Sequence, residues 1–166
     1  MQESEILSQM RQLVGEENLI SSCSGEGCRV YLTDIPPERL IVDVDRLFDA
    51  HGLKSKRCDR FVLFTNLNKD SLVVVLIELK SGGFNTTDVF QQLQSSANFI
   101  SDIIPRDCTT ECIPILFHGK GMRKVQNTDL RRSEVLFRGE KVPIRRNNCG
   151  TQENLANVLR QAQVLS

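Results

Sequence analysis

The stretch Leu72-Val73-Val74-Val75-Leu76-Ile77-Glu78-Leu79-Lys80 decides the fold, because it is apolar on both faces until its last three positions. A strand of this kind is typical of the centre of a sheet that helices cover on both sides. Glu78 and Lys80 are two positions apart, so they point to one face while Leu79 points to the other. The stretch therefore predicts a buried central strand that ends in an acid and a base.

A hairpin is expected before this strand. Phe61 to Phe64 is a second apolar run, and the residues between the two runs are rich in the Asn, Asp and Ser of turns. A turn about Asn68-Lys69 sets the register and, carried outward, places Asp59 opposite Glu78. Two carboxylates at that spacing repel each other unless a cation lies between them.

A helix and a parallel strand are expected after it. Apolar residues repeat at helical spacing from a cap at Thr87-Asp88 to Pro105, and Ile113 to Phe117 is again wholly apolar. A long helix between two buried strands favours a right-handed parallel crossover. The C-terminal ends of the two strands should then lie together.

The remaining elements complete an α/β fold, a single domain of residues 1–166 with a mixed central β-sheet flanked by helices. We expect a helix ending at Gly15, a strand at Arg29 to Thr33, an apolar run at Leu40 to Val44, a helical turn at Arg46 to Ala50, a hairpin joining Val135-Phe137 to Val142-Ile144 around Arg138 to Lys141, and a closing helix capped by Thr151.

The bulk composition is that of a globular protein of one domain. The chain has 166 residues, and 40% of them are hydrophobic and 25% charged. Its longest apolar run, Leu72 to Ile77, is far shorter than the roughly 20 residues of a membrane span, and acids occupy the N-terminus where a signal peptide carries bases. We therefore expect a cytoplasmic protein with no membrane partner.

The cysteines are interpreted as reduced thiols, since no secretory signal accompanies them. A zinc site is the alternative, although the spacings are not those of a usual zinc knuckle. The four residues that such a site would use are Cys23, Cys28, Cys108 and Cys112; Cys58 and Cys149 complete the six cysteines of the chain.

The paired carboxylates point to metal chemistry. Hard divalent ions such as Mg²⁺ take carboxylate, carbonyl and water oxygens, so Asp59, Glu78 and the backbone carbonyl of Leu79 are the expected ligands. Lys80 can hold a water for in-line attack and stabilise charge that develops on phosphorus. The residues thus predict Mg²⁺- or Mn²⁺-dependent hydrolysis of phosphodiesters, and a structural ion-pair network is the alternative.

At these positions the sequence resembles the PD-(D/E)xK superfamily, the restriction-endonuclease-like nucleases. The match reads Cys58-Asp59-Arg60 and then Glu78-Leu79-Lys80 before a Gly-Gly turn, and the resemblance covers about Cys58 to Phe117. It implies a restriction-endonuclease-like core at about residues 58–118. It also implies that Asp59 and Glu78 bind metal and that Lys80 is catalytic.

The resemblance also implies a glutamine on the following helix that orients the water, for which Gln92 is preferred over Gln91 and Gln94. The chain departs from the family pattern in two ways, and the second leaves the number of metal ions open. Cys58 replaces the usual proline, and no single acid stands out on the helix before the core, where the candidates are Glu16, Glu17, Asp43 and Asp45.

The charge is unevenly distributed, although the net charge is zero. Residues 120–146 hold nine bases against three acids, which suggests a surface that faces phosphates. A merely solvated basic surface is the alternative, with the substrate track then near Lys54, Lys56, Arg57 and Arg60. The expected nucleic-acid contacts are Lys120, Lys124, Arg145 and Arg146.

The predicted function is therefore a nuclease whose substrate is expected to be DNA. Two other functions remain. One is a non-catalytic nucleic-acid-binding or assembly subunit that keeps the fold, and the other is a toxin-like or defence effector nuclease that works in a homo-oligomer or a larger complex. His118 ends the last core strand, where it either completes the strand or contacts a phosphate. A Walker-type nucleotide site is excluded, because Gly119-Lys120-Gly121 lacks its spacing.

Overall fold

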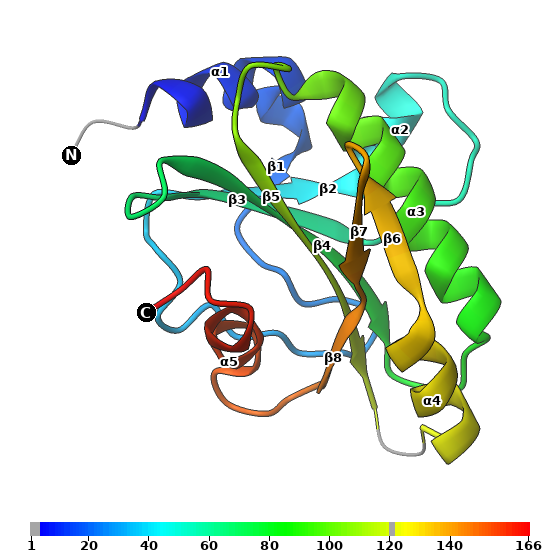
Figure 1. The fold of residues 1–166 in the computed structure, drawn as a ribbon. Coiled ribbons are helices and arrows are strands. Elements are labelled where there is room, and N and C mark those ends of the chain that lie inside the picture. The colour runs from blue at the N-terminus through cyan, green and yellow to red at the C-terminus, as the bar shows by residue number, and fades with distance from the viewer. Residues whose placement is uncertain (1–3, 120–121) are drawn as a thin grey trace.

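A six-stranded mixed sheet forms the centre of the protein (Figure 1). The structure, a computed structural model, describes residues 4–119 and 122–166. The six strands lie in the order β1-β2-β3-β4-β5-β8, and β6 and β7 form a separate hairpin. The elements are α1 (Glu5–Val14), the 3-10 helix η1 (Glu16–Asn18), β1 (Leu19–Ile20), β2 (Leu40–Asp43), α2 (Val44–Ala50), β3 (Arg60–Asn66), β4 (Ser71–Lys80), α3 (Thr86–Ile103), β5 (Thr110–His118), α4 (Lys124–Arg132), β6 (Glu134–Phe137), β7 (Glu140–Pro143), β8 (Arg145–Asn148) and α5 (Asn154–Gln161).

The β3–β4 hairpin has the register that its turn predicts. Thr65 lies opposite Leu72 and Arg60 lies opposite Ile77. All of β4 is buried except Lys80 at its end. The chain then crosses through α3 and returns as β5, which is parallel to β4. The expected hairpin and parallel crossover are thereby confirmed, as is the mixed α/β sheet with flanking helices.

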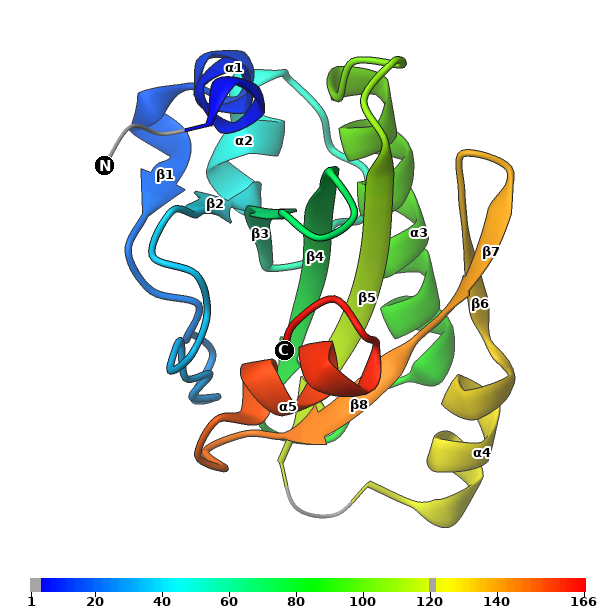
Figure 2. The ribbon, with the colours of Figure 1, turned by 60° about the vertical axis from the view of Figure 1, so that its left-hand side comes forward.

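Alternate residues of the central strands face two separate cores. Leu76 and Leu116 pack with α1, α2 and α3, whereas Ile77 and Phe117 pack with α5 and the segment before β2. Figure 2 shows α3 and α5 on opposite sides of β5. Glu78 follows Leu76 on the α3 side, and this alternation fixes the face on which the polar end of β4 opens. Within the described part of the chain, no helix has the length and apolar content needed to cross a bilayer.

The β6–β7 hairpin is fastened to α3 by side chains. The amide group of Gln94 on α3 donates to the carbonyl of Leu136 and accepts from its backbone N–H, both at 2.9 Å. Arg138 at the hairpin tip donates to the carbonyls of Ser101 at 3.0 Å and Ile104 at 2.6 Å. The last carbonyls of a helix have no partner within it. The hairpin expected around Arg138 to Lys141 is confirmed, and its tip caps α3.

The strand expected at Arg29 to Thr33 is wrong. The carbonyl of Arg29 accepts from the N–H of Gly150 at 2.8 Å, and the N–H of Tyr31 donates to the side chain of Asn154 at 2.9 Å. The backbone of this segment is therefore satisfied by the loop and helix start near α5. The alternating side chains do not require a neighbouring strand when such partners exist.

Both expected helix caps lie at other residues. Asn85 caps α3, because its side-chain oxygen accepts from the N–H of Thr87 at 2.8 Å and of Asp88 at 3.2 Å. The helix α5 begins at Asn154, three residues after Thr151, whose carbonyl accepts from the Asn154 N–H at 3.1 Å. At α3 a neighbouring polar side chain thus meets the amide groups that the expected cap would have met, whereas Glu153 at the N-cap of α5 makes no side-chain capping bond.

The sequence analysis missed the strands β1 and β8 and the helix α4. β8 consists of Arg145, Arg146, Asn147 and Asn148, so it has no apolar alternation that would identify it. Its pairing with β5 defines it as a strand. Both strands are short and lie at the edges of the sheet, where tertiary pairing outweighs local propensity.

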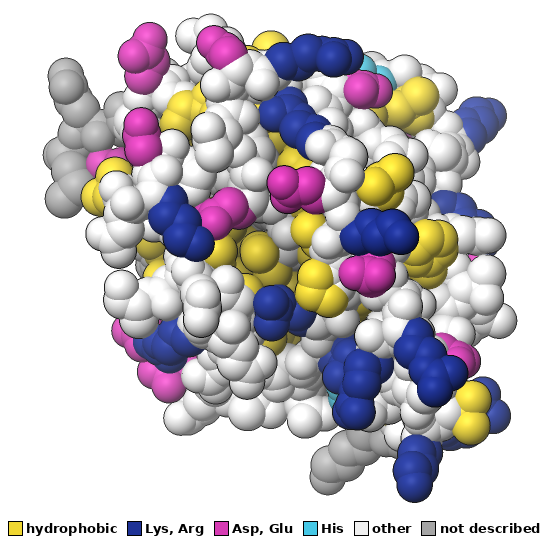
Figure 3. Space-filling model, in the orientation of Figure 1, with side chains coloured by type: hydrophobic (Ala, Val, Ile, Leu, Met, Phe, Trp, Pro, Cys, Tyr) yellow, Lys and Arg dark blue, Asp and Glu magenta, His cyan; other side chains and the backbone are white. Residues whose placement is uncertain are grey.

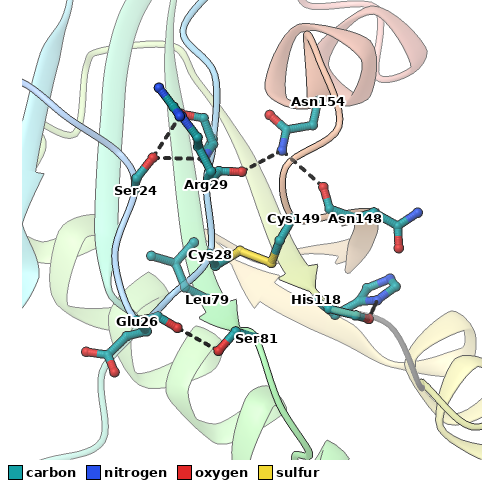
Figure 4. The surroundings of a disulfide bond; sticks show 12 residues. Ser24, Glu26, Cys28, Arg29, Leu79, Ser81, His118, Asn148, Cys149 and Asn154 are labelled. Carbon is teal, nitrogen blue, oxygen red and sulfur yellow. Dashed lines mark hydrogen bonds between the residues drawn. A yellow bond between two sulfur atoms is a disulfide. The ribbon is translucent and has the colours of Figure 1, made fainter.

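A disulfide joins Cys28 to Cys149, so the expectation of six reduced thiols is wrong for this pair (Figure 4). The two residues are 121 positions apart, and nothing in their spacing indicates that the fold brings them together. The four-cysteine zinc alternative fails as well. Cys28 is used in the disulfide, and Cys23 and Cys112 lie in different cores on opposite faces of the sheet. Disulfides are rare in reducing compartments, so the cytoplasmic location stays a prediction.

Candidate active site

Asp59 and Glu78 line one pocket at the end of the β3–β4 hairpin. The strand pairing ends with Arg60 opposite Ile77, and the backbone N–H of Asp59 also donates to the carbonyl of Ile77, at 2.9 Å, so the direct pairing of Asp59 with Glu78 stays a prediction. The side chain of Asp59 accepts from the N–H of Leu79 at 2.7 Å. The hairpin therefore holds one carboxylate in a fixed orientation beside the other.

Glu78 is almost fully buried, with 1% of its side chain exposed, and its Oε2 lies 3.5 Å from the Nζ of Lys80. Burial first, and then the hydrogen bond and negative charge of Asp59, raise the pKa of Glu78 to about 9, while Lys80 opposes part of this rise. The metal-free protein thus carries a proton on Glu78 at neutral pH. Desolvation disfavours the charged carboxylate, and the ammonium group of Lys80, 3.5 Å away, does not compensate for it.

Two buried oxygen atoms at this place have no hydrogen-bond partner within residues 4–119 and 122–166. They are Oε2 of Glu78 and Oε1 of Gln92 on α3. Gln91 is exposed and Gln94 is bound to Leu136, so Gln92 is the glutamine that the helix brings to the site, as the sequence favoured. Buried acceptors without partners are costly, and their presence side by side indicates a place for a cation or a water.

These atoms open into a pocket of about 220 Å³ at the C-terminal end of β4. One wall of this pocket is the turn that carries Glu26, whose backbone carbonyl accepts from Oγ of Ser81 at 2.7 Å. The Cys28–Cys149 disulfide ties the same turn to the end of β8 (Figure 4). The pocket is lined by Glu26, Asp59, Glu78, Leu79, Lys80, Ser81, Gly82 and Gln92.

Sequence reasoning missed Glu26 because nothing local marks it. It lies in a tight turn at φ 54°, and only the long-range disulfide and the bond from Ser81 bring it to the pocket. A larger pocket of about 450 Å³ lies at the opposite end of the hairpin, near Thr65 and Leu72. Its lining includes none of the buried unpartnered atoms identified among the described residues, so the smaller pocket is the better candidate.

The donor atoms fit a hard divalent ion. Asp59 and Glu78 supply carboxylate oxygens and Gln92 an amide oxygen, which are the ligand types of Mg²⁺ and Mn²⁺. The described residues contain no group of three or more His, Cys, Asp or Glu side chains arranged to hold a metal, so the protein offers a site of two acids. The ligand role expected of the Leu79 carbonyl stays a prediction.

None of the four candidate third acids lines the pocket. Glu16 is paired with Arg11, and Asp43 caps α2. Asp45 has a raised pKa, chiefly through burial, with the charge of Asp59 as a smaller cause. Asp45 is thus the candidate whose pKa the charge of Asp59 affects, although its side chain is largely exposed.

The end of β5 continues the polar surface beside Lys80. His118 is paired in register with Lys80 on the same face, and its Nδ1 lies 3.0 Å from the carbonyl of Gly119. The backbone passes so close that a Cβ on Gly119 would lie 2.2 Å from the Ser81 carbonyl oxygen. Only glycine fits there, and it keeps the ends of β4 and β5 together.

The residues expected to contact nucleic acid lie in different places. Lys120 lies outside the described residues. Lys124 begins α4, where Figure 3 shows Lys and Arg side chains gathered. Arg146 is opposite Leu116 and shares the face of Glu78, whereas Arg145 is opposite Ile115 and faces the α5 side. The structure therefore brings Arg146, and not Arg145, to the face of the pocket.

The alternative basic track is largely committed to other contacts. Lys56 is paired with Asp88, and Arg57 donates to Asp49 at 3.1 Å. Comparison with protein-family models, curated proteins and solved structures finds no match to this chain. Membership of the PD-(D/E)xK nucleases accordingly stays a prediction from the sequence motif.

Proposed function

We propose that this protein is a divalent-metal-dependent nuclease that hydrolyses phosphodiester bonds of DNA. The observation that supports this proposal is a pair of buried acceptor oxygens, on Glu78 and Gln92, that lack partners within the described chain beside a lysine. A pocket of this kind needs a cation and ordered water to satisfy it. Asp59 and Glu78 would hold Mg²⁺ or Mn²⁺, which when bound polarises a phosphate and acidifies a water.

The side chains of the pocket have distinct roles in this proposal. Asp59, oriented by the Leu79 N–H, presents a carboxylate that cannot rotate freely. Glu78 releases its proton when it takes up its ligand role, because a ligand carboxylate must be ionised. Lys80 lies at the rim, where 28% of its side chain is exposed, and stabilises charge that develops on the phosphate. Gln92 accepts a hydrogen bond from the attacking water and fixes its direction.

A structural ion-pair network explains the pocket less well. Such a network is expected to keep Glu78 ionised and fully bonded, since an unpaired buried charge is strongly unfavourable. Instead its pKa is raised to about 9, and its one cation partner in residues 4–119 and 122–166 is 3.5 Å away. The arrangement costs stability in the metal-free protein, which is typical of a site kept for function.

The experiment is incubation of the purified protein with plasmid, linear duplex, single-stranded DNA and RNA in Mg²⁺, Mn²⁺ or EDTA. Cleavage should require metal and should be lost in Asp59→Asn, Glu78→Gln and Lys80→Ala. The matched controls are Glu134→Gln and Lys69→Ala, which remove exposed charges outside the pocket. Full activity in Lys80→Ala, or cleavage that persists in EDTA, would contradict the proposal.

A further inference from the structure

We propose that Arg131 of α4 and Arg146 of β8 together hold one backbone phosphate of the nucleic-acid strand, a few nucleotides from the bond that is cleaved. This inference rests on the proposed function, because it adds a second contact to the same substrate. It also gives the direction in which the strand leaves the pocket.

The sheet places Arg146 in line with the pocket. Glu78 is in register with Leu116, and Leu116 is in register with Arg146, so all three lie at one level on one face. Two strand spacings separate Glu78 from Arg146, which is about 10 Å. Successive phosphates of one strand advance about 3.4 Å along the helix axis. A phosphate at Arg146 is therefore about two or three nucleotides from one at Glu78.

The backbone places the C-terminal end of α4, which carries Arg131, beside the start of β8, which carries Arg146. The carbonyl of Ser133 accepts from the N–H of Ile144 at 3.5 Å, which fixes the end of α4 beside the start of β8. Burial, and then the positive charge of Arg131, lower the pKa of Arg146. In residues 4–119 and 122–166, neither arginine has a carboxylate within ion-pair distance.

Two neighbouring guanidinium groups without a counter-charge repel each other, and an anion between them removes that repulsion. Guanidinium forks match a phosphate by two parallel hydrogen bonds each. Some arginines of the described chain are paired with acids: Arg57 lies 3.1 Å from Asp49, and Arg160 lies 2.8 Å from Asp34. Arg131 and Arg146 are not, so their guanidinium donors remain available to an anion.

The negative end of the α4 dipole is the simpler explanation for a base in its last turn. It accounts for Arg131 but not for Arg146, which lies on a strand. Between Lys80 and β8, the strand β5 ends in His118, which is in register with both Lys80 and Asn148. His118 and Asn148 point to the side of the strands away from the disulfide (Figure 4). The strand is therefore expected to run from Lys80 across β5 toward β8 and α4.

The test is binding of a labelled DNA duplex in Ca²⁺, which allows binding to be measured separately from Mg²⁺-dependent cleavage. Arg131→Ala and Arg146→Ala should each weaken binding about tenfold, the usual effect of losing a hydrogen bond to a charged group. The slope of log affinity against log salt should fall by about one unit. Arg145→Ala is the matched control, because this neighbour on β8 faces the opposite side. Arg131 is exposed, so its variant tests the site even if Arg146→Ala folds poorly.

A scan of duplexes that each carry one uncharged methylphosphonate identifies the phosphate. The parent should lose affinity at one position two or three nucleotides from the cleaved bond, and both variants should be insensitive at that same position. Because the two arginines share one phosphate, the double variant should lose less than the product of the single losses. A parent displaced from DNA by low-millimolar inorganic phosphate would instead show a general small-anion site and overturn the proposal.

Variants that bind DNA as Arg145→Ala does, or a parent without affinity for DNA, would also overturn it. Failure of the nuclease proposal is a separate result. In that case the parent binds DNA and shows the position-specific loss, yet cleaves nothing in Mg²⁺ or Mn²⁺. Conversely, cleavage that is unaffected by Arg131→Ala and Arg146→Ala would agree with the nuclease proposal and would contradict the phosphate contact of the two arginines.

Discussion

The proton on Glu78 makes the stability of the metal-free protein depend on pH in an unusual direction. The folded protein holds this proton up to about pH 9, whereas the ordinary pKa of a glutamate is 4.5. Between these values the folded state binds one proton more than the unfolded chain, so stability falls as pH rises. The contribution is fully present below about pH 4.5 and is lost as pH rises through about 9.

The magnitude follows from linkage. One proton corresponds to at most about 1.4 kcal/mol per pH unit, so raising the pH from 6 to 8 removes up to about 3 kcal/mol. For a chain of this length that is a fall in Tm of about 6 to 10 °C. Glu78→Gln should lack this component, while Glu134→Gln, an exposed change of the same kind, should keep it.

Urea unfolding in EDTA at pH 6, 7 and 8 measures the effect as the difference in slope between parent and Glu78→Gln. Saturating Mg²⁺ should abolish the difference, because the ligand carboxylate is then ionised in the folded protein. Mg²⁺ should accordingly raise Tm more at pH 8 than at pH 6. Equal pH slopes in the parent and in Glu78→Gln would refute the buried, protonated carboxyl and the reasoning built on it.

Three further changes test other parts of the structure. Asp59→Ala should lower the free energy of unfolding by about 1 to 3 kcal/mol, because it leaves the Leu79 N–H without its acceptor. Asp59→Asn keeps an acceptor oxygen, so its free energy of unfolding should stay near that of the parent. Urea unfolding compares the two variants, and equal losses would contradict this hydrogen bond. Cys28→Ser should lower the free energy of unfolding by about 2 to 5 kcal/mol, and it should weaken DNA cleavage because it releases the turn of Glu26. Reduction of the parent with a dithiol should reproduce both effects. A reduced parent that is unchanged in stability and cleavage would exclude the link between the disulfide and the pocket. Arg138→Ala should cost about 1 to 3 kcal/mol and increase amide exchange at the end of α3, since its guanidinium caps that helix, and exchange that is unaltered there would argue against the cap.

The hairpin at the centre of the site could be predicted from the sequence because its signals are local. Apolar runs, a polar turn and a period of two residues fix the register as far as Arg60 and Ile77, and Asp59 and Glu78 are the next residues of the two strands. The glutamine on α3 follows from helical spacing. These residues could be assigned to the site without knowing which distant segments of the chain are in contact.

The rest of the site depends on contacts that no local pattern encodes. Glu26 reaches the pocket through Ser81 and through a disulfide that closes over 121 residues. The faces of Arg145 and Arg146 are set by β8, a polar strand that exists only through its pairing with β5. Side chains that lie on a short edge strand cannot be assigned to a face before that pairing is known.

The shortness of the edge strands also bears on how copies of this chain could associate. The sheet ends in β1, of two residues, and in β8, of four. Long free edges invite strand addition and aggregation, and short ones discourage it. On the separate hairpin, the side chain of Gln94 occupies the backbone N–H and carbonyl of Leu136, which would otherwise be an open edge. The two ends of the six-stranded sheet therefore offer little backbone to which the strand of a second copy could be added.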